Sequence, residues 1–471
     1  MRSTKIVATI GPASSSLEVL ERMIDAGLDV ARLNFAHGTA ESHAEVVERI
    51  RTASASFDRE VAVLGDLPGP KLRIGPIADD GVAELDLGSR VVLTQEDVPG
   101  TDHRLPVEWP GFAEIVEEGD ICYLADGAIR LRVCEVAGED VVTEVEVAGV
   151  VASRQGINLP DVTMSLPAVS QDDLRLIDAG LEMGVDLFAL SFVRRREDLD
   201  PVRAHLAHRG QDIPLIAKIE KPQAAAGAEE IVDAADAIMV ARGDLGIELP
   251  IEEVPLVQKR LLTLAGRASK PSITATQMLE SMVHSTRPTR AEVADVANAI
   301  FDGTDAVMLS QETAVGRHPV DAVAMMAAIA IATERELPYG RWMIERGQRH
   351  KGEAEAIALG AVGAVYELDL KAIVAPTYSG ETARLIAAHR PAVPVLALCP
   401  RADVVRHCAL EWGVIAELYE APHDTLELID ACADAARRHG LAKTGDRIGI
   451  TAGLPAGRSG GTNLFKVHTL D

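Results

Sequence analysis

The sequence contains few aromatic residues, few cysteines and little basic charge. Phe, Trp and Tyr make up only 3% of its 471 residues, so the core has to be built mainly from Ala, Val, Ile and Leu. The 46 Lys and Arg residues are outnumbered by 72 Asp and Glu residues, which gives a formal net charge of −26. A negative surface repels nucleic acid and anionic membranes, so we expect neither as a partner. A small anionic substrate would need locally placed cations or a metal ion.

The five cysteines do not follow the pattern of a disulfide framework or a zinc site. Their number is odd and no CxxC spacing occurs, which indicates reduced thiols. The longest apolar run, residues 322–332, is much shorter than the roughly 20 residues that span a bilayer. The first residues lead straight into a strand-like segment without the apolar core of a signal peptide. We therefore expect a cytoplasmic protein.

Short β-branched segments alternate with helical segments along most of the chain. This alternation is typical of a parallel sheet made from β-α units, and eight such strands would close a (β/α)8 TIM barrel. A capping-box pattern, Thr289 followed by Glu292, predicts a helix that begins at Arg290. The eight predicted strands span residues 5–11, 30–37, 62–67, 185–192, 214–220, 237–244, 271–276 and 305–310.

Two regions do not fit a simple barrel. Residues 68–184 exceed what one crossover helix requires, and alternating segments such as 141–147 predict a small inserted β-barrel-like domain. After the eighth strand, helices and strands alternate again, which predicts a C-terminal α/β domain. Its predicted helices are 356–367 and 382–389, and its predicted strands are 371–376, 393–399, 447–451 and 464–468. We expect the barrel at 1–68 and 167–337, the inserted domain at 69–166 and the C-terminal domain at 338–471.

The predicted strand ends are rich in polar residues, and the C-terminal strand ends of a β/α barrel form its active site. Lys218 and Glu220 alternate on one strand and so share a face, while Asp244 takes the equivalent place on the next strand. Taken alone, Lys218 and Glu220 could be a structural ion pair. Because neighbouring strands lie roughly 5 Å apart, Glu220 and Asp244 can share a hard cation such as Mg²⁺.

Further cations surround this pair of carboxylates in the predicted barrel. Arg32, Arg73, Arg194 and Lys218 would supply positive charge for a multiply anionic substrate, and residues 243–246 offer bare backbone N–H groups. These residues predict metal-assisted phosphoryl transfer or enolate chemistry on a phosphorylated or carboxylated small molecule. They do not identify the substrate.

Motifs along the whole chain resemble those of the pyruvate kinase family. They are residues 4–14, 31–38, 156–160, 217–220, 239–246, 274–282, 288–292, 302–310 and 462–468. The resemblance implies the three-domain organisation described above. It also implies transfer of a phosphoryl group from phosphoenolpyruvate to ADP, giving pyruvate and ATP in the last step of glycolysis.

The resemblance also assigns roles to individual residues. It implies that Glu220 and Asp244 hold Mg²⁺, with Mn²⁺ as an alternative, and that Lys218 and Arg32 stabilise the phosphoryl group. Enolate protonation would involve Thr276. The expected substrate-binding residues are Arg32, Ser191, Lys218, Gly243, Asp244 and Thr276, and the expected nucleotide-binding residues are Asn34, His37 and Arg73.

The monovalent-cation site departs from the pattern of most family members, which hold K⁺. Asn34 and Asp66 remain, but Ala36 and Leu67 replace two ligands and Lys71 replaces a glutamate. This combination resembles the K⁺-independent branch, with the Lys71 ammonium in place of K⁺. A solvated loop lysine is the alternative for Lys71. We therefore expect activity without K⁺.

Other features bear on nucleotide use, regulation and assembly. Asp172 and Gln311 replace residues usual in the family, which leaves the nucleotide preference open. The resemblance implies a homotetramer and a phosphorylated effector held at Thr377, Ser379, Gly380, Thr382 and Arg458. A helix N-cap is the alternative for that loop, because Glu381 would repel a phosphate.

Two other functions compete with this interpretation. One is a Mg²⁺-dependent barrel aldolase or lyase, which the long insert and the lysine beside Glu220 disfavour. The other is a regulatory paralogue with an altered site. Asp172 and Gln311 leave this alternative open, and it is disfavoured by the retention of Arg32, Lys218, Glu220, Asp244 and Thr276.

Overall fold

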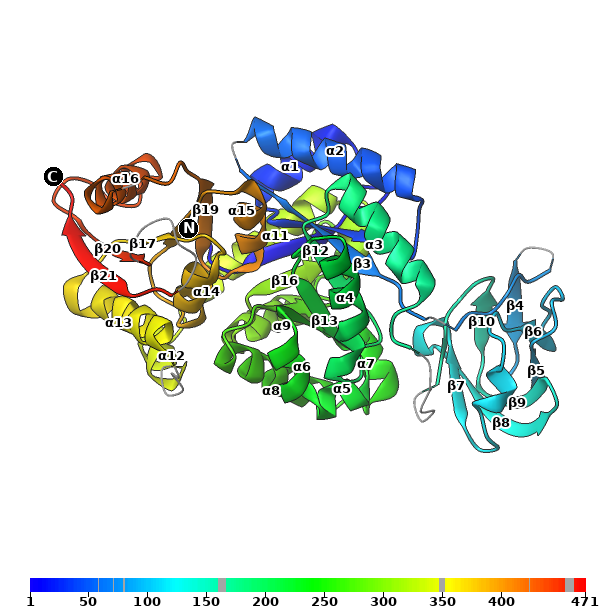
Figure 1. Cartoon of the computed structure of the whole chain (residues 1–471). Helices are drawn as coiled ribbons and strands as arrows, with labels where there is room; N and C mark the ends of the chain where they lie inside the picture. The colour runs from blue at the N-terminus through cyan, green and yellow to red at the C-terminus, as the bar shows by residue number, and fades with distance from the viewer. Residues whose placement is uncertain are drawn as a thin grey trace.

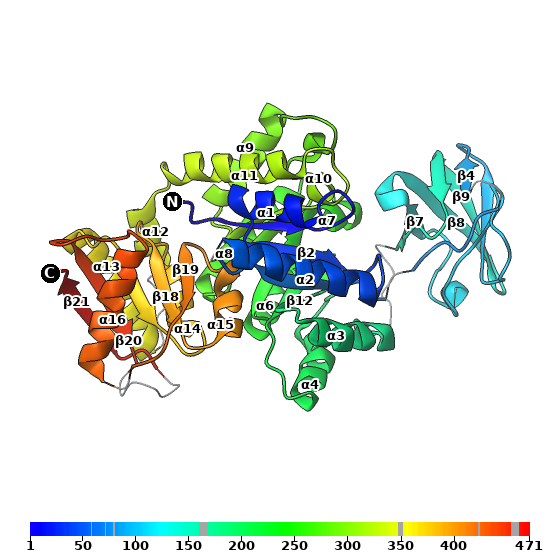
Figure 2. The same cartoon turned by 90° about the horizontal axis from the view of Figure 1, so that it is seen from above.

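The computed structural model describes residues 1–57, 59–70, 72–78, 81–159, 167–346, 352–422, 424–453 and 461–471. Figures 1 and 2 show three bodies in a row, with the barrel between the inserted domain and the C-terminal domain. The inserted domain and the C-terminal domain therefore stand at opposite ends of the barrel. No helix in these residue ranges is long and apolar enough to cross a membrane.

The central body is a closed barrel of eight parallel strands in the order β1-β16-β15-β14-β13-β12-β3-β2. All eight strands predicted from the sequence are confirmed. They are β1 (Lys5–Thr9), β2 (Val30–Asn34), β3 (Ala62–Leu67), β12 (Leu187–Leu190), β13 (Leu215–Ile219), β14 (Ala237–Ala241), β15 (Ser272–Ala275) and β16 (Ala306–Leu309).

Helices surround the barrel and bury their apolar faces against the strands. The helix predicted from Thr289 and Glu292 is confirmed, because the Glu292 amide donates to Thr289 Oγ1 at 3.2 Å and the Thr289 amide donates to Glu292 Oε2 at 2.7 Å. The surrounding helices are α1 (Leu17–Ala26), α2 (Ala40–Ser56), α3 (Gln171–Met183), α4 (Asp200–His208), α5 (Pro222–Ala226), α6 (Ala228–Ala234), α7 (Arg242–Glu248), α8 (Val254–Arg267), α9 (Arg290–Phe301), α10 (Gln311–Ala314) and α11 (Pro319–Glu334).

The inserted domain follows β3 and is a β domain, as expected. Its strands form a six-stranded sheet in the order β11-β7-β8-β9-β5-β6 and a two-stranded sheet of β10 and β4, around a hydrophobic core of their own. The strands are β4 (Val82–Leu85), β5 (Arg90–Thr94), β6 (Arg104–Pro106), β7 (Ile121–Leu124), β8 (Ile129–Ala137), β9 (Asp140–Val147), β10 (Gly149–Ala152) and β11 (Ile157–Asn158).

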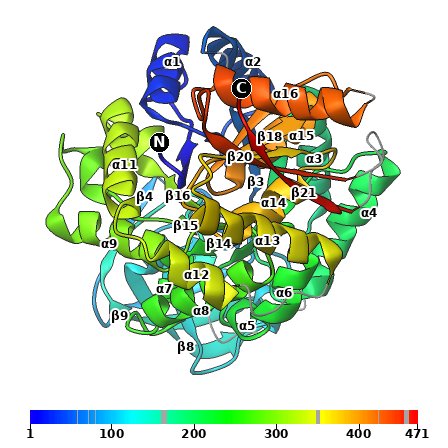
Figure 3. The same cartoon turned by 90° about the vertical axis from the view of Figure 1, so that its left-hand side faces the viewer.

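The C-terminal domain has a five-stranded sheet in the order β19-β18-β17-β20-β21, in which β21 runs antiparallel to β20. Figure 3 views the molecule from this domain, with α13 and α16 on its near side. The predicted strands are found, but edge strand β19 was missed. The elements are α12 (Tyr339–Arg346), α13 (Glu353–Leu368), β17 (Ile373–Pro376), α14 (Glu381–Ala388), β18 (Val395–Cys399), α15 (Ala402–His407), β19 (Val414–Leu418), α16 (Thr425–Arg438), β20 (Arg447–Ala452) and β21 (Leu464–Thr469).

The C-terminal domain closes the end of the barrel away from the inserted domain. Leu410, in a short 3-10 helix after α15, belongs to the hydrophobic cluster inside the barrel together with Val7 and Ile216. Trp412 is 1% exposed and packs into the cluster between the strands and the outer helices. The barrel interior is therefore sealed at one end.

Candidate functional site

A cavity of about 970 Å³ lies between the C-terminal ends of the barrel strands and the inserted domain. The strands bring to it many of the residues predicted from the sequence, and the inserted domain contributes Arg73 from the opposite side. The predicted residues that line the cavity are Arg32, Asn34, Ala36, His37, Asp66, Leu67, Arg73, Ser191, Lys218, Glu220 and Asp244.

Lys218 lies at the centre of the charged groups in this cavity. Its ammonium donates to Ser191 Oγ at 2.6 Å and lies 3.3 Å from both Asp66 Oδ1 and Glu220 Oε2. Burial by itself would lower the pKa of Lys218, but the carboxylates of Asp66 and Glu220 outweigh burial and raise it. Lys218 is therefore a permanent cation that cannot act as a base near neutral pH.

Asp66 joins the two cations of the site. Its Oδ2 accepts from Arg32 at 2.7 Å, and its Oδ1 faces Lys218. Burial would raise the pKa of Asp66, but Lys218 and Arg32 together lower it. Thr9 on β1, which sequence analysis missed, completes the arrangement by accepting from Arg32 at 2.8 Å through its hydroxyl. The guanidinium of Arg32 is thus fixed from two strands.

Glu220 and Asp244 have a donor set that fits a magnesium ion. Burial raises the pKa of Glu220, the Asp244 carboxylate adds to that rise, and Lys218 opposes it. Two carboxylates that repel each other in a buried site are stabilised by a divalent cation, and Mg²⁺ takes one or two carboxylates with water and substrate oxygens as its other ligands. Among the residues that the structure describes, no group of three or more Asp, Glu, His or Cys could hold a metal.

The backbone next to Ser191 holds Glu220 in place. Phe192 has a φ of 58°, which is rare for a residue other than glycine, and its amide donates to Glu220 Oε1 at 2.7 Å. The Lys221 ammonium lies 5.3 Å from the centre of the Phe192 ring and pairs with Glu248. Unusual backbone at a strand end is a recurrent feature of functional sites.

Thr276 and Gly243 are brought together but are not among the residues that line the cavity. Thr276 has a φ of 71°, and its hydroxyl accepts from the Gly243 amide at 2.7 Å. The amide predicted to face a substrate carboxylate therefore bonds to Thr276 here. The Thr276 carbonyl accepts from the Arg242 guanidinium at 2.8 Å, a contact that sequence analysis missed.

Glu312, on the short helix α10, is another residue that sequence analysis did not single out. Its side chain is fully buried, and its carboxylate accepts from Leu279 N at 3.0 Å and from Ser310 N at 2.6 Å. These bonds connect the loop after β15, which begins with Thr276, to the end of β16. The only signal in the sequence was an acidic residue two positions after Ser310, the polar strand end.

The three residues expected on the nucleotide side, Asn34, His37 and Arg73, all line the cavity. Asn34 Oδ1 accepts from the Ala36 amide at 3.2 Å, and Arg73 donates to the Arg154 carbonyl at 3.2 Å. His37 is exposed at the start of the loop before α2. Lys71 lies outside the described residues.

Asp172 and Gln311, which replace residues usual in the family, both occupy exposed positions at the start of a helix. Asp172, in the first turn of α3, is exposed and forms an ion pair with Arg175. Gln311 begins α10. Neither residue is among those that line the cavity.

The candidate effector residues lie far from this cavity, in the C-terminal domain. Thr377 Oγ1 accepts from the Gly380 amide at 3.0 Å, and Thr382 and Thr462 share a hydrogen bond of 2.7 Å between their hydroxyls. Ser379 belongs to the same loop, at the edge of a small cavity between the barrel and the C-terminal domain. Arg458 lies outside the described residues.

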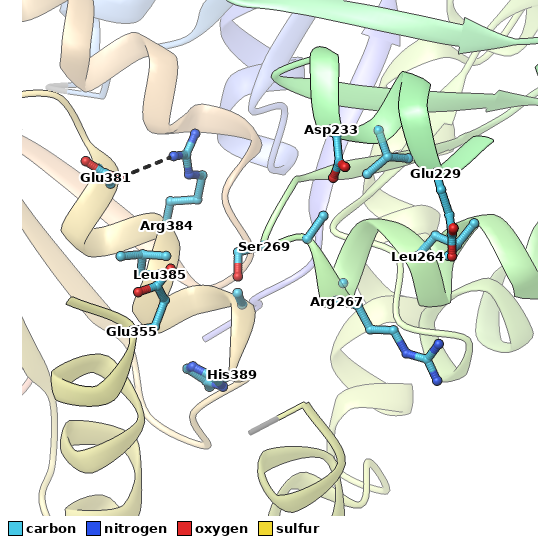
Figure 4. A pocket seen from close by; sticks show the side chains of 14 residues that line it. Glu229, Asp233, Leu264, Arg267, Ser269, Glu355, Glu381, Arg384, Leu385 and His389 are labelled. Atoms are coloured by element: carbon cyan, nitrogen blue, oxygen red, sulfur yellow. Dashed lines mark ion pairs between the residues drawn. The ribbon is translucent and has the colours of Figure 1, made fainter. Parts of the chain in front are cut away.

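A second large cavity, of about 720 Å³, lies beside this loop between the C-terminal domain and the barrel. Figure 4 shows Glu381 and Arg384 of α14 on one side, with an ion pair of 4.0 Å between them, and Asp233 and Glu229 of α6 on the other. Its lining mixes acidic and basic groups, as the lining of the first cavity does.

The fold and the strand-end residues together define a class of barrel enzymes that act on small anionic substrates with buried cations and paired carboxylates. Two family models match this chain. The model described as "Pyruvate kinase, barrel domain" matches residues 1–323, and "Pyruvate kinase, alpha/beta domain" matches residues 355–468.

Curated relatives agree with the family models. A pyruvate kinase of Geobacillus stearothermophilus is 46% identical over 476 residues, which cover 100% of this chain and 80% of that protein. A pyruvate kinase of Thermococcus litoralis is 43% identical over 473 residues, which cover 99% of this chain and 98% of that protein. The chain belongs to the pyruvate kinase family.

Proposed function

We propose that the chain catalyses the reaction of its family through the strand-end residues described above. The phosphoryl group leaves the enol oxygen of phosphoenolpyruvate and forms a bond to a terminal oxygen of ADP, giving ATP. The enolate left behind takes a proton at its methylene carbon and becomes pyruvate. The observation that carries the assignment of the site is the buried ammonium of Lys218, held among Ser191, Asp66 and Glu220 at the cavity.

Lys218 and Arg32 are the proposed phosphoryl-binding cations. A loose phosphoryl-transfer transition state is stabilised mainly by positioning and by fixed positive charge, which costs no reorganisation when it is already in place. Asp66 bonds to both side chains and so fixes their mutual position before the substrate arrives. Ser191, which accepts from Lys218, orients the ammonium.

Glu220 and Asp244 would hold Mg²⁺, with Mn²⁺ as an alternative. When bound, such an ion supplies positive charge next to phosphate and carboxylate oxygens. The chain's own contribution is the Phe192 amide, which fixes one oxygen of Glu220 by a bond of 2.7 Å.

Thr276 is the proposed participant in enolate protonation, through a water molecule. Its hydroxyl is held by the Gly243 amide and donates to the Ala275 carbonyl at 2.6 Å, so its position is set by two neighbouring strands. Gly243 is the proposed contact for the substrate carboxylate, which requires its amide to exchange Thr276 for the substrate.

Asn34, His37 and Arg73 are the proposed nucleotide contacts. They lie where the barrel meets the inserted domain, so a nucleotide bound there would touch both bodies. Because Asp172 and Gln311 depart from the family pattern, the preference among nucleoside diphosphates is a question for competition assays.

We further propose that activity does not require K⁺. Asp66, one of the two remaining cation ligands, already has both carboxylate oxygens facing cations of the chain, Arg32 and Lys218. Ala36 and Leu67 line the cavity but offer no side-chain oxygen. Rates with Na⁺ and with K⁺ that agree within about twofold would support this proposal, and a strict K⁺ requirement would refute it.

Regulation, assembly and location remain predictions. We predict a homotetramer in a cytoplasmic location, and an effector phosphate bound at Thr377, Ser379, Gly380, Thr382 and Arg458. The domain boundaries at 68/69, 166/167 and 337/338 are predictions as well. Rates measured with added sugar phosphates and AMP test the effector, and light scattering tests the oligomer.

One assay separates the proposed function from its alternatives. Purified protein is incubated with phosphoenolpyruvate, ADP and Mg²⁺, and both pyruvate and ATP are measured. We expect equal amounts of the two products. Pyruvate formed without ADP would favour a lyase, and the absence of both products would favour a catalytically altered paralogue.

A further inference from the structure

Both ends of the insertion bond to one buried carboxylate, that of Asp173 in the first turn of α3. Asp173 Oδ1 accepts from the amide of Gly69, just after β3, at 3.0 Å. Asp173 Oδ2 accepts from the amide of Ser170 at 2.8 Å and from its hydroxyl at 2.6 Å. The chain leaves the barrel at Gly69 and has returned to it at Ser170, so one fully buried side chain connects both ends of the insertion.

Gly69 is also in contact with the catalytic end of the barrel. Its φ of +65° suits glycine, and a Cβ at this position would lie 2.7 Å from Cδ2 of Phe192. Phe192 is the residue whose amide holds Glu220. The insertion therefore begins directly beside the residue whose amide holds Glu220.

A helix cap alone does not account for these contacts. Ser170 and Asp173 form a capping box, which is a common local device for starting a helix. The bond from Gly69 is not part of a capping box, and it joins residues 104 positions apart in the sequence. It uses the carboxylate oxygen that the cap leaves free.

We propose that Asp173 is a positioning residue for phosphoryl transfer, which fixes the inserted domain and its Arg73 over the nucleotide side of the cavity by bonding Gly69 and Ser170 together. This inference rests on the proposed function, because it requires the nucleotide to contact the inserted domain. Asp173 acts through Gly69 and touches no reacting atom.

The test compares three variants with the wild-type chain. In Asp173→Asn the side chain keeps its shape, but one of its two acceptor oxygens becomes an NH₂ donor that cannot accept from Gly69 while the other caps α3. Ser170→Ala removes the hydroxyl of the cap and leaves the bond to Gly69. Glu182→Gln changes an exposed residue near the end of the same helix and serves as the matched control.

The measurements are kcat, KM for ADP, the melting temperature and the exchange of pyruvate methyl protons in D₂O. Proton exchange reverses the protonation step and uses barrel residues only, so it reports on the barrel without the nucleotide. We expect Asp173→Asn to lower kcat/KM for ADP by about tenfold, equivalent to about 1.4 kcal/mol of transition-state stabilisation. Its proton exchange should stay within about twofold of wild type.

Ser170→Ala and Glu182→Gln should keep kcat/KM for ADP within about twofold of wild type, even though Ser170→Ala lowers the melting temperature. If Asp173→Asn keeps kcat/KM for ADP within about twofold of wild type, as Ser170→Ala is expected to do, the proposal is wrong. If the wild-type chain transfers no phosphoryl group, the proposed function fails instead.

A second measurement needs no variant and covers the case in which Asp173→Asn does not fold. Amide hydrogen exchange of wild-type peptides containing Gly69 should be slow, comparable to that of strand β3, with or without ADP. Exchange at the rate of an exposed loop would contradict the proposal, because it would show that the Gly69 bond does not persist.

Discussion

The two ends of the barrel both bury charged side chains, but they use them differently. At the end facing the inserted domain, Lys218 and Arg32 border a cavity of about 970 Å³. At the other end, Arg390 is 1% exposed and donates to Asp305 at 2.7 Å and to the Gly303 carbonyl at 2.6 Å. Leu410 packs there against the barrel interior, and the cavity beside it measures about 260 Å³.

The comparison shows that buried charge by itself does not identify an active site. Arg390 pairs with one carboxylate, lies 4.9 Å from the Trp412 ring and connects the C-terminal domain to the barrel. Lys218 faces two carboxylates and still borders open space that a substrate can enter. Changes at the first end should therefore reduce the rate, and changes at the second end should reduce stability.

The largest effect is expected for Lys218→Met. The variant removes the fixed cation proposed to stabilise the phosphoryl group, and we expect kcat to fall by at least about 10³-fold. The coupled assay for pyruvate measures this loss. Lys259→Met, at an exposed lysine on α8 paired with Asp302, is the control and should keep the wild-type rate. Equal rates for wild type and Lys218→Met would contradict the proposed role.

Thr276→Ala should reduce kcat by about 10²-fold, because the variant removes the hydroxyl proposed to take part in enolate protonation. Thr276→Ser keeps the hydroxyl and should recover most of the rate. The steady-state rate and the pyruvate proton exchange should fall together in Thr276→Ala. A loss confined to KM would place Thr276 in binding.

At the opposite end, Arg390→Met should destabilise the protein without changing its chemistry. The variant leaves Asp305 buried without its partner, and breaking such a pair costs about 3–5 kcal/mol. Urea unfolding measures the loss, and Arg401→Met, at an exposed pair with Asp403, should cost less than about 1 kcal/mol. The folded Arg390→Met variant should retain kcat at 25 °C; a hundredfold loss of rate would show that this end takes part in catalysis.

The smallest effect concerns pH and Glu411, also at the closed end. Burial raises the pKa of Glu411 to about 8, although Arg384 opposes the rise. At pH values between the ordinary carboxyl pKa and about 8, Glu411 is ionised in the unfolded chain but stays protonated in the folded protein. The contribution of Glu411 to the free energy of unfolding therefore falls as pH rises through this range, and it levels off above about pH 8.

Glu411→Gln removes that dependence and should raise the melting temperature at pH 9 more than at pH 5, by a few degrees. Thermal unfolding followed from pH 5 to pH 9 measures the difference. Glu420→Gln, at an exposed position, is the control. An equal shift at both pH values would show that Glu411 is ionised in the folded protein throughout this range.

Much of the architecture could be predicted from the sequence because hydrophobic periodicity and polar strand ends are local signals. All eight barrel strands were found, and strand alternation placed Lys218 with Glu220. Asp244 was expected on the next strand, but it lies in the first turn of α7, which begins directly after β14. Edge strand β19 was missed, since it is short and its residues are only partly buried.

Contacts made across the fold carried no local signal. Arg242 reaches the Thr276 carbonyl from the neighbouring strand end, and Glu312 forms hydrogen bonds with two separate loops. Asp173 bonds to Gly69, which lies 104 positions earlier in the sequence. Such partners are set by the closure of the barrel, and a single sequence does not show which side chains will meet there. The positive φ of Phe192 and Thr276 could not be predicted from the sequence either, because neither residue type favours that conformation.

The central claim is that the open end of the barrel is a site for phosphoryl transfer between phosphoenolpyruvate and ADP. Parallel assays of the wild-type chain and of Lys218→Met, with Mg²⁺ and with either Na⁺ or K⁺, test it most directly by measuring pyruvate and ATP together. The account predicts equal amounts of both products from the wild type in either salt and almost none from the variant. Pyruvate without ATP, or no difference between the two proteins, would contradict it.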